Sequence, residues 1–308
     1  MPTTPRLDRP PVRRAFSILD GLRMLGLSAL LAGLCQAQPA DDLLRRVPPG
    51  AGLTVVVEDL REHAEDWLRS PLAADLGRLS EQGGWPGDET LHRLAIARRE
   101  IEIALNIDLA TIRDALLGDA VVLSMHLEPG ASPEEAQGLL LVQARDLDLL
   151  RRLVERLNAA ERVAGQLESL EDREHSGQPY TARQFLGDHR RPEFYTILDD
   201  GAFAWSNSES LIQGVIDRSG DGPSGLGDEP AFQAVRRALP ERSVVSLFVD
   251  PGFVRKVLEA DPGTPPEADL PPLLVNYLRA IRYAGLALEW RDGPVLHLHE
   301  SIDTDRLS

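Results

Sequence analysis

The chain of 308 residues carries 33 basic and 49 acidic side chains, a formal charge of −16 at pH 7, with 43% apolar and 5% aromatic residues. This acidity argues against binding to nucleic acid or to anionic lipid surfaces, which need a basic field. The few aromatic residues also offer few platforms for stacked bases. The length allows one large domain or two modest ones with a sizeable core.

The first 37 residues have the features of an export signal. Arginines, among them Arg23, precede an apolar run at 24–34, and Cys35-Gln36-Ala37 provides small residues for cleavage. A run of eleven residues is too short to cross about 30 Å of hydrocarbon as a helix. We therefore expect export to the periplasm or cell envelope, with no membrane span in the mature chain. The alternative is a buried N-terminal helix.

Two details of this signal bear on the mature protein. Lipid attachment at Cys35 is disfavoured because Leu34 occupies a position where a lipobox has a small residue, whereas Arg13-Arg14 leaves the twin-arginine route open beside the general one. Removal of residues 1–37 takes away five arginines and two aspartates, which changes the formal charge from −16 to −19. The mature chain then has no cysteine, and so no disulfide and no thiol nucleophile.

The mature chain opens with a short lead-in at 38–50 and continues as alternating strands and helices. β-branched and alternating runs indicate strands, whereas apolar residues at helical spacing indicate helices. Strands are predicted at 53–58, 119–128, 138–144, 167–174, 179–186, 192–198, 202–206, 243–249, 283–291 and 294–302. Helices are predicted at 60–80 with a break at Ser70-Pro71, at 89–106 and 110–117, through the stripe from Leu147 to Leu157, after Ser208, at 229–239 and 251–259, and after a proline-rich link at 262–272.

The order of these elements contains an imperfect repeat. The runs 53–59 and 244–250 are both apolar strands that end in an acid and enter a helix, and each is followed by more helix and a hairpin. This predicts an α+β fold with mostly antiparallel sheets covered by amphipathic helices, in about one and a half copies of a strand–helix–helix–hairpin unit. The predicted divisions are an export signal at 1–37, a lead-in at 38–50, a first unit at 51–218, a flexible junction at 219–228, a second, shorter unit at 229–303 packed on the first, and a tail at 304–308.

Three segments resemble a family of exported bacterial proteins that is known only as a domain of unknown function. They are Val47-Pro-Pro-Gly with Leu53-Thr-Val-Val-Val-Glu-Asp-Leu60 and Trp67-Leu-Arg-Ser-Pro-Leu72, then Asp200-Gly-Ala-Phe-Ala-Trp-Ser-Asn-Ser-Glu-Ser-Leu211, and Gly225-Leu-Gly-Asp-Glu-Pro-Ala-Phe232. The resemblance covers about residues 47–300 and implies the fold and export. The family has no accepted catalytic residues, so it implies no activity.

Two motifs carry possible chemistry. Gly220-Asp-Gly-Pro-Ser-Gly225 matches the dinucleotide fingerprint G-x-G-x-x-G, but a predicted helix precedes it where the fingerprint needs a strand, so we interpret it as a linker. His297 and His299 alternate in a strand and project from one face, which we interpret as a solvated sheet face; the alternative is that they share a metal ion there. A third ligand would have to come from the adjacent strand, for instance Glu289, whose side of the sheet is open. The opposite face, with Leu296 and Leu298, is expected to turn toward the core.

The remaining polar and aromatic residues have simpler interpretations. Asp146 is expected to start a helix and Asp200 to form a turn, and no pair of acids is seen to converge as general acid–base catalysis requires. Trp205 and Trp290 are expected to pack strands against helices. Trp85, between glycines and a proline, is also expected to pack in the core, although it is the one aromatic residue for which exposure at a binding edge is an alternative.

These observations predict an exported binding or structural module of the cell envelope. No catalytic residue, cofactor-binding residue, metal ligand or cofactor is assigned. The partner is an unknown envelope protein or a small ligand, and nucleic acid is excluded. Two alternatives stay open: a carrier of an apolar ligand, and a metal-dependent, hydrolase-like enzyme that uses His297 and His299 with a carboxylate.

Overall fold

The computed structural model describes residues 38–69, 107–128, 131–132, 135–187, 190–219, 222–253, 280–290 and 293–303, together with the single residues 99 and 102. Several predictions fall outside these residues. They are the export signal with Cys35, the loop with Trp85, the helices at 71–80, most of 89–106 and 254–259, the proline-rich link with the helix after it, and the tail at 304–308.

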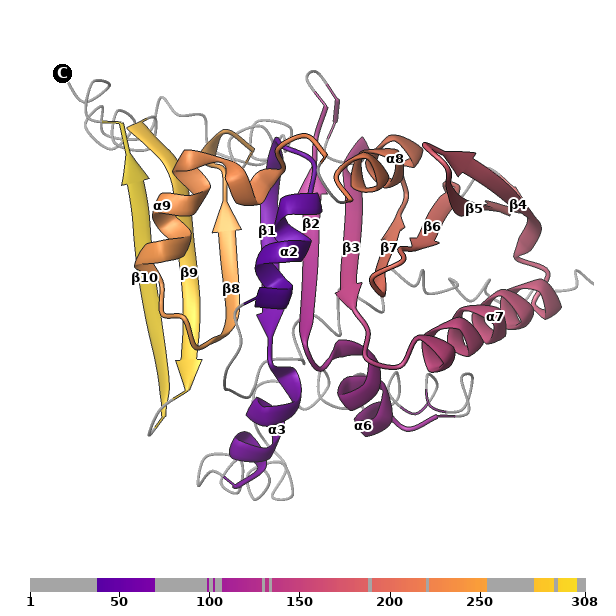
Figure 1. The fold of residues 1–308 in the computed structure, drawn as a ribbon, viewed down its shortest axis with the longest axis horizontal. Coiled ribbons are helices and arrows are strands. Elements are labelled where there is room, and N and C mark those ends of the chain that lie inside the picture. The colour runs from indigo at the N-terminus through magenta and orange to yellow at the C-terminus, as the bar shows by residue number, and fades with distance from the viewer. Residues whose placement is uncertain are drawn as a thin grey trace, which may run out of the picture.

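The described strands form one antiparallel sheet of ten strands (Figure 1). Its spatial order is β10-β9-β8-β1-β2-β3-β7-β6-β5-β4, so that β10 and β4 are its two edges. The strands are β1 (Ala51–Glu58), β2 (Ala120–His126), β3 (Gln137–Gln143), β4 (Leu167–His175), β5 (Gln178–Phe185), β6 (Glu193–Ile197), β7 (Ala202–Ser206), β8 (Ser243–Val249), β9 (Ile281–Trp290) and β10 (Pro294–Ile302).

Helices lie on both faces of this sheet. The described ones are α2 (Gln38–Arg46), α3 (Leu60–Arg69), α6 (Leu109–Ile112), the π-helical turn η1 (Arg113–Leu117), α7 (Leu147–Val163), α8 (Glu209–Asp217), the 3₁₀ turn η3 (Leu226–Asp228) and α9 (Pro230–Ala238). In the described part of the chain, no helix has the length and apolar character to cross a membrane.

Alternation along the strands divides the core into two clusters, one on each face. Leu141 and Ala204 belong to the first cluster, which also contains the apolar residues of α2, α8 and α9. Their neighbours Val142 and Trp205 belong to the second cluster, with the apolar stripe of α7 and Leu116 of η1. Side chains of successive strand residues point to opposite faces, so β2, β3, β6 and β7 contribute to both clusters.

The segment 38–50 is more than the predicted lead-in, because its first nine residues form α2. Leu43 and Leu44 are fully buried, and α2 lies across the near face of the sheet in Figure 1. Gly225 accommodates the end of this helix, since a Cβ atom there would lie 1.8 Å from the carbonyl oxygen of Arg45. The next residue, Leu226, donates its backbone N–H to the carbonyl of Val47 at 2.8 Å.

The predicted fold class is wrong in its architecture. Helices and antiparallel strands are both present, but there is one continuous sheet in a largely sheet-based fold, and no division into one and a half units. The two strands that suggested a repeat, β1 and β8, are hydrogen-bonded neighbours in this sheet, with Val55 opposite Leu247. Local patterns identify strands, whereas this pairing joins segments far apart in the sequence.

Candidate functional site

The edge strand β10 carries the histidines that the sequence singled out. The register places His297 opposite Ala287 and Val295 opposite Glu289, so His297 and Glu289 share one face of the sheet. Nε2 of His297 lies 3.0 Å from Oε2 of Glu289, whose side chain is 8% exposed. Glu289 therefore lies on the same side of the sheet as His297, and its carboxylate holds the imidazole of His297 in place.

His299 lies further along the same strand, opposite Gly285, and is exposed. Within the described ranges, no group of three or more His, Cys, Asp and Glu side chains is close enough together to hold a metal ion. The structure thus brings His297 and Glu289 together, but does not gather a three-ligand set at β10 from the residues it describes.

The other face of β10 differs from the prediction. Leu296 is 64% exposed and Leu298 is 66% exposed, although both were expected to face the core. Val295 and Ile302 of the same strand are also exposed, at 39% and 38%. The reason is that α9 packs on the face of the histidines: Gly285, which lies opposite His299, is close to Val235 of α9, whereas Leu296 and Leu298 point to the other face. An edge strand with exposed apolar side chains is a candidate binding surface.

The opposite edge, β4, has a different character. Its nine residues include four acids and one arginine, namely Glu168, Glu171, Asp172, Glu174 and Arg173. Arg173 pairs with Glu171 at 2.6 Å and with Glu209 of α8 at 2.6 Å. Charged side chains on an edge strand hinder pairing with another strand. The two edges of the sheet are therefore chemically unlike.

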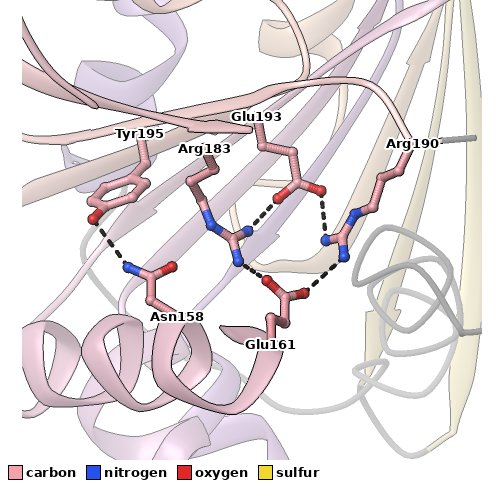
Figure 2. A network of polar contacts seen from close by, with 6 residues as sticks. All are labelled: Asn158, Glu161, Arg183, Arg190, Glu193 and Tyr195. Carbon is pink, nitrogen blue, oxygen red and sulfur yellow. Dashed lines mark hydrogen bonds and ion pairs between the residues drawn. The ribbon is translucent and has the colours of Figure 1, made fainter. Parts of the chain in front are cut away.

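A buried ring of four charged side chains lies behind the β4 edge (Figure 2). Arg183 of β5 contacts both Glu193 of β6 and Glu161 of α7, and Arg190 completes the ring with a distance of 2.9 Å to each glutamate. The side chain of Arg183 is fully buried, and burial lowers the pKa of its guanidinium below the ordinary value. Two positive and two negative charges balance within the ring.

Aromatic rings surround this cluster of charges. The guanidinium carbon of Arg183 lies 4.6 Å from the ring centre of Trp205 and 5.1 Å from that of Phe185, and that of Arg190 lies 3.7 Å from Phe185. Cations favour such positions over aromatic faces. The ring thus fastens α7 to β5 and β6, and its charged groups are used in structure.

Ser124 and His126 of β2 form a second buried polar pair. Oγ of Ser124 lies 3.1 Å from Nε2 of His126, and the two residues are 0% and 7% exposed. Burial lowers the pKa of His126 to about 4, so its imidazole is neutral at pH 7. A hydroxyl beside a neutral imidazole has the composition of a nucleophile and a base. Both side chains lie in the core, however, so we interpret the pair as a hydrogen-bonded core contact.

The end of β1 holds another buried charge. Oε1 of Glu58 accepts a hydrogen bond from Arg236 of α9 at 2.9 Å, whereas its Oε2 is buried and finds no hydrogen-bond partner among the described residues. Burial raises the pKa of Glu58, and Arg236 opposes this rise. The next residue, Asp59, has φ +49° where β1 turns into α3. These groups join α9 to the centre of the sheet.

The acids that the sequence assigned to local structure have those roles. Oδ1 of Asp146 accepts a hydrogen bond from the backbone N–H of Leu149 at 2.8 Å, which confirms its role at the start of α7. Asp200 accepts hydrogen bonds from Ala202 in the turn and from Arg46 of α2. The pairing with Arg46 spans 154 residues, so no local pattern could have shown it.

The sequence reasoning missed the buried ring and the exposure of β10. The sequence did contain one signal for the ring. Thr181, Arg183 and Phe185 occupy every second position of a strand, so Arg183 shares a face with an aromatic residue. Trp205, expected to pack a strand against helices, does contact the α7 cluster and is 7% exposed. Comparisons of the chain with models of known protein families, with curated proteins and with solved structures found no match.

Proposed function

We propose that the chain is an exported interaction module of the cell envelope whose binding surface is the β10 edge. The observation that carries the proposal is the exposure of Leu296 and Leu298 on a strand that ends the sheet. An edge strand offers outward-facing backbone N–H and C=O groups to an extended polypeptide, and neighbouring apolar side chains add contact area. The ligand class is therefore an extended polypeptide segment.

The buried charged and nucleophilic side chains described above contact partners inside the protein. The four charges of the buried ring neutralise one another, Glu58 is paired with Arg236, and Ser124 with His126 lies inside the core. Among the described residues, the β10 edge combines four exposed apolar side chains with a single charged residue. The export part of the proposal rests on the basic and apolar pattern of residues 1–37 and on the resemblance to exported proteins of unknown function.

The binding proposal is tested by photocrosslinking in cells that produce the full chain. A photoreactive amino acid replaces Leu298 in one variant and Val163, which is 90% exposed at the end of α7, in the control. We expect a crosslinked adduct from position 298 and none from position 163. If neither variant forms an adduct, or if both form adducts equally, the result would contradict a binding surface at β10.

The same cells test the export proposal. We expect the accumulated protein in the envelope fraction, shortened by about the length of the predicted signal. Full-length chain that stays in the cytoplasm, with residues 1–37 attached, would contradict export.

A further inference from the structure

We propose that the occupant of the β10 edge is the β10 edge of a second copy of this chain. The two strands pair antiparallel around a twofold axis at His297 and join two ten-stranded sheets into one. This inference rests on the proposed function and names its partner. It is drawn from the sequence of the edge, from its exposed side chains and from the contrast with the β4 edge.

The symmetry of a pair of identical edges sets the geometry. A twofold interface uses the same patch on both subunits, so residue i faces residue j and residue j faces residue i. Two copies of one strand related by an axis perpendicular to the sheet run antiparallel, which is the pairing of all the other strands here. The exposed face of β10 in one copy then continues into the exposed face of the other.

The side chains of β10 match in this register. With the axis at His297, the exposed Leu296 lies opposite Leu298 of the partner subunit, and the same contact recurs on the other side of the axis. Glu300, the one Asp, Glu, Lys or Arg residue of β10, lies opposite Pro294 of the partner subunit. The register therefore sets the two most exposed leucines of β10 against each other and keeps like charges from facing each other directly.

Charge also selects this edge over β4. The same construction with β4 and an axis at Glu171 would set Glu171 against its own copy and Glu168 against Glu174 of the partner subunit. Directly opposed like charges destabilise a strand pair. In a chain with a formal charge of −16, most surfaces of two copies repel. β10 has a low charge and is thus the edge suited to self-pairing.

The oligomeric state is the first test. Sedimentation equilibrium of the purified full chain is compared with that of L298E and of the matched control V163E, which adds the same charge at an exposed apolar position away from β10. We expect a monomer–dimer equilibrium for the wild type and for V163E. In L298E the dissociation constant of the dimer rises about tenfold or more, because the change brings like charge into the interface.

Two outcomes of this experiment would overturn the inference. One is a wild-type chain that stays monomeric at every concentration measured. The other is open-ended growth beyond dimers, which indicates a head-to-tail contact between unlike surfaces. The photocrosslink in cells separates these failures from failure of the proposed function: an adduct of position 298 with a different protein, together with a monomeric pure chain, keeps the binding edge and rejects the second copy.

Disulfide formation tests the register. In a C35A background, which lacks other cysteines, H297C places a thiol on the proposed axis, and H299C places one two residues away on the same face. Thiols of directly opposite residues are within reach of a disulfide, whereas residue 299 faces Val295 of the partner subunit. We expect covalent dimers of C35A/H297C and none of C35A/H299C under mild oxidation. Equal or reversed crosslinking would overturn the register and its twofold axis.

Discussion

The two edge strands of the sheet, β4 and β10, carry side chains of opposite character. β4 carries four acids and an arginine in nine residues, and behind it lies the buried ring of Arg183, Glu161, Glu193 and Arg190. β10 carries one carboxylate, and its Leu296 and Leu298 lie in solvent. Charges at an edge discourage another strand, and apolar side chains there invite one. The difference indicates that β4 resists pairing with a further strand, whereas β10 is suited to it.

The regions behind these edges differ as well. Near β4, ion pairs and cations over aromatic rings connect α7 to the strands. Near β10, α9 packs through Phe232, whose ring centre lies 4.5 Å from that of Phe248, and Gly285 leaves space for this helix because a Cβ there would lie 2.3 Å from Val235. α7 is therefore held by a four-membered network of buried charges, whereas α9 is held by apolar contacts and a single buried ion pair between Arg236 and Glu58.

The largest expected effect comes from the buried ring behind β4. R183M leaves Glu161 and Glu193 buried without their main partner, and we expect a loss of about 3–5 kcal/mol in the free energy of unfolding. Urea unfolding measures it. The control R151A removes an exposed pair with Asp148, for which we expect about 0–1 kcal/mol. Equal losses in the two variants would contradict a structural role for the ring.

A smaller effect, on pH dependence, is expected at the centre of the sheet, between the two edges. Because the folded pKa of His126 is about 4 and its ordinary value is 6.5, the unfolded chain binds a proton first as the pH falls. The contribution of His126 is fully present above pH 6.5 and is lost as the pH falls toward 4. Between pH 7.5 and 4.5 this amounts to about 2–3 kcal/mol.

The variant H126N removes this dependence, and urea unfolding at the two pH values measures the difference from the wild type. His63, whose pKa burial lowers to about 3, adds a loss of the same sign that both proteins share. The control V163N, which changes an exposed side chain without a titratable group, keeps the pH dependence of the wild type. An H126N protein that loses as much stability on acidification as the wild type would show that burial of His126 does not matter.

The smallest expected effect concerns the charges of β4 itself. E171Q/E174Q removes two acids from that edge, and we expect species larger than a dimer to form weakly at high concentration because a second edge becomes available. The control D148N/E155Q removes two acids from α7, and light scattering compares the two. Identical association of both variants would show that the acids of β4 do not protect the edge.

The sequence predicted local elements better than their arrangement. The strand 243–249 is found at the predicted bounds, and the capping role of Asp146 is confirmed, because both depend on nearby residues. The single sheet was missed because it depends on the pairing of β1 with β8 and of β3 with β7, which joins strands that are far apart in the sequence. The lead-in was not recognised as α2, although Leu43, Leu44 and Val47 have helical spacing.

The candidate site shows the same limit. Alternation in 294–302 correctly separated His297 and His299 from Leu296 and Leu298, but it could not say which face is covered. That depends on the face on which α9 packs, close to Gly285 and hence on the side of the histidines. The contact between His297 and Glu289 follows from the register of the hairpin, in which Trp290 lies opposite Pro294. Neither the covered face nor the register can be derived from the sequence of one strand alone.

Hydrogen exchange of backbone amides at low and at high protein concentration tests the contrast between the two edges most directly. Amides of β10 that point away from β9 should exchange quickly in the dilute protein and become protected as the concentration rises, because pairing with a second copy takes them out of solvent. The outward amides of β4 should exchange at the same rate throughout. Protection that does not change with concentration in β10, or that rises equally in β4, would contradict the account.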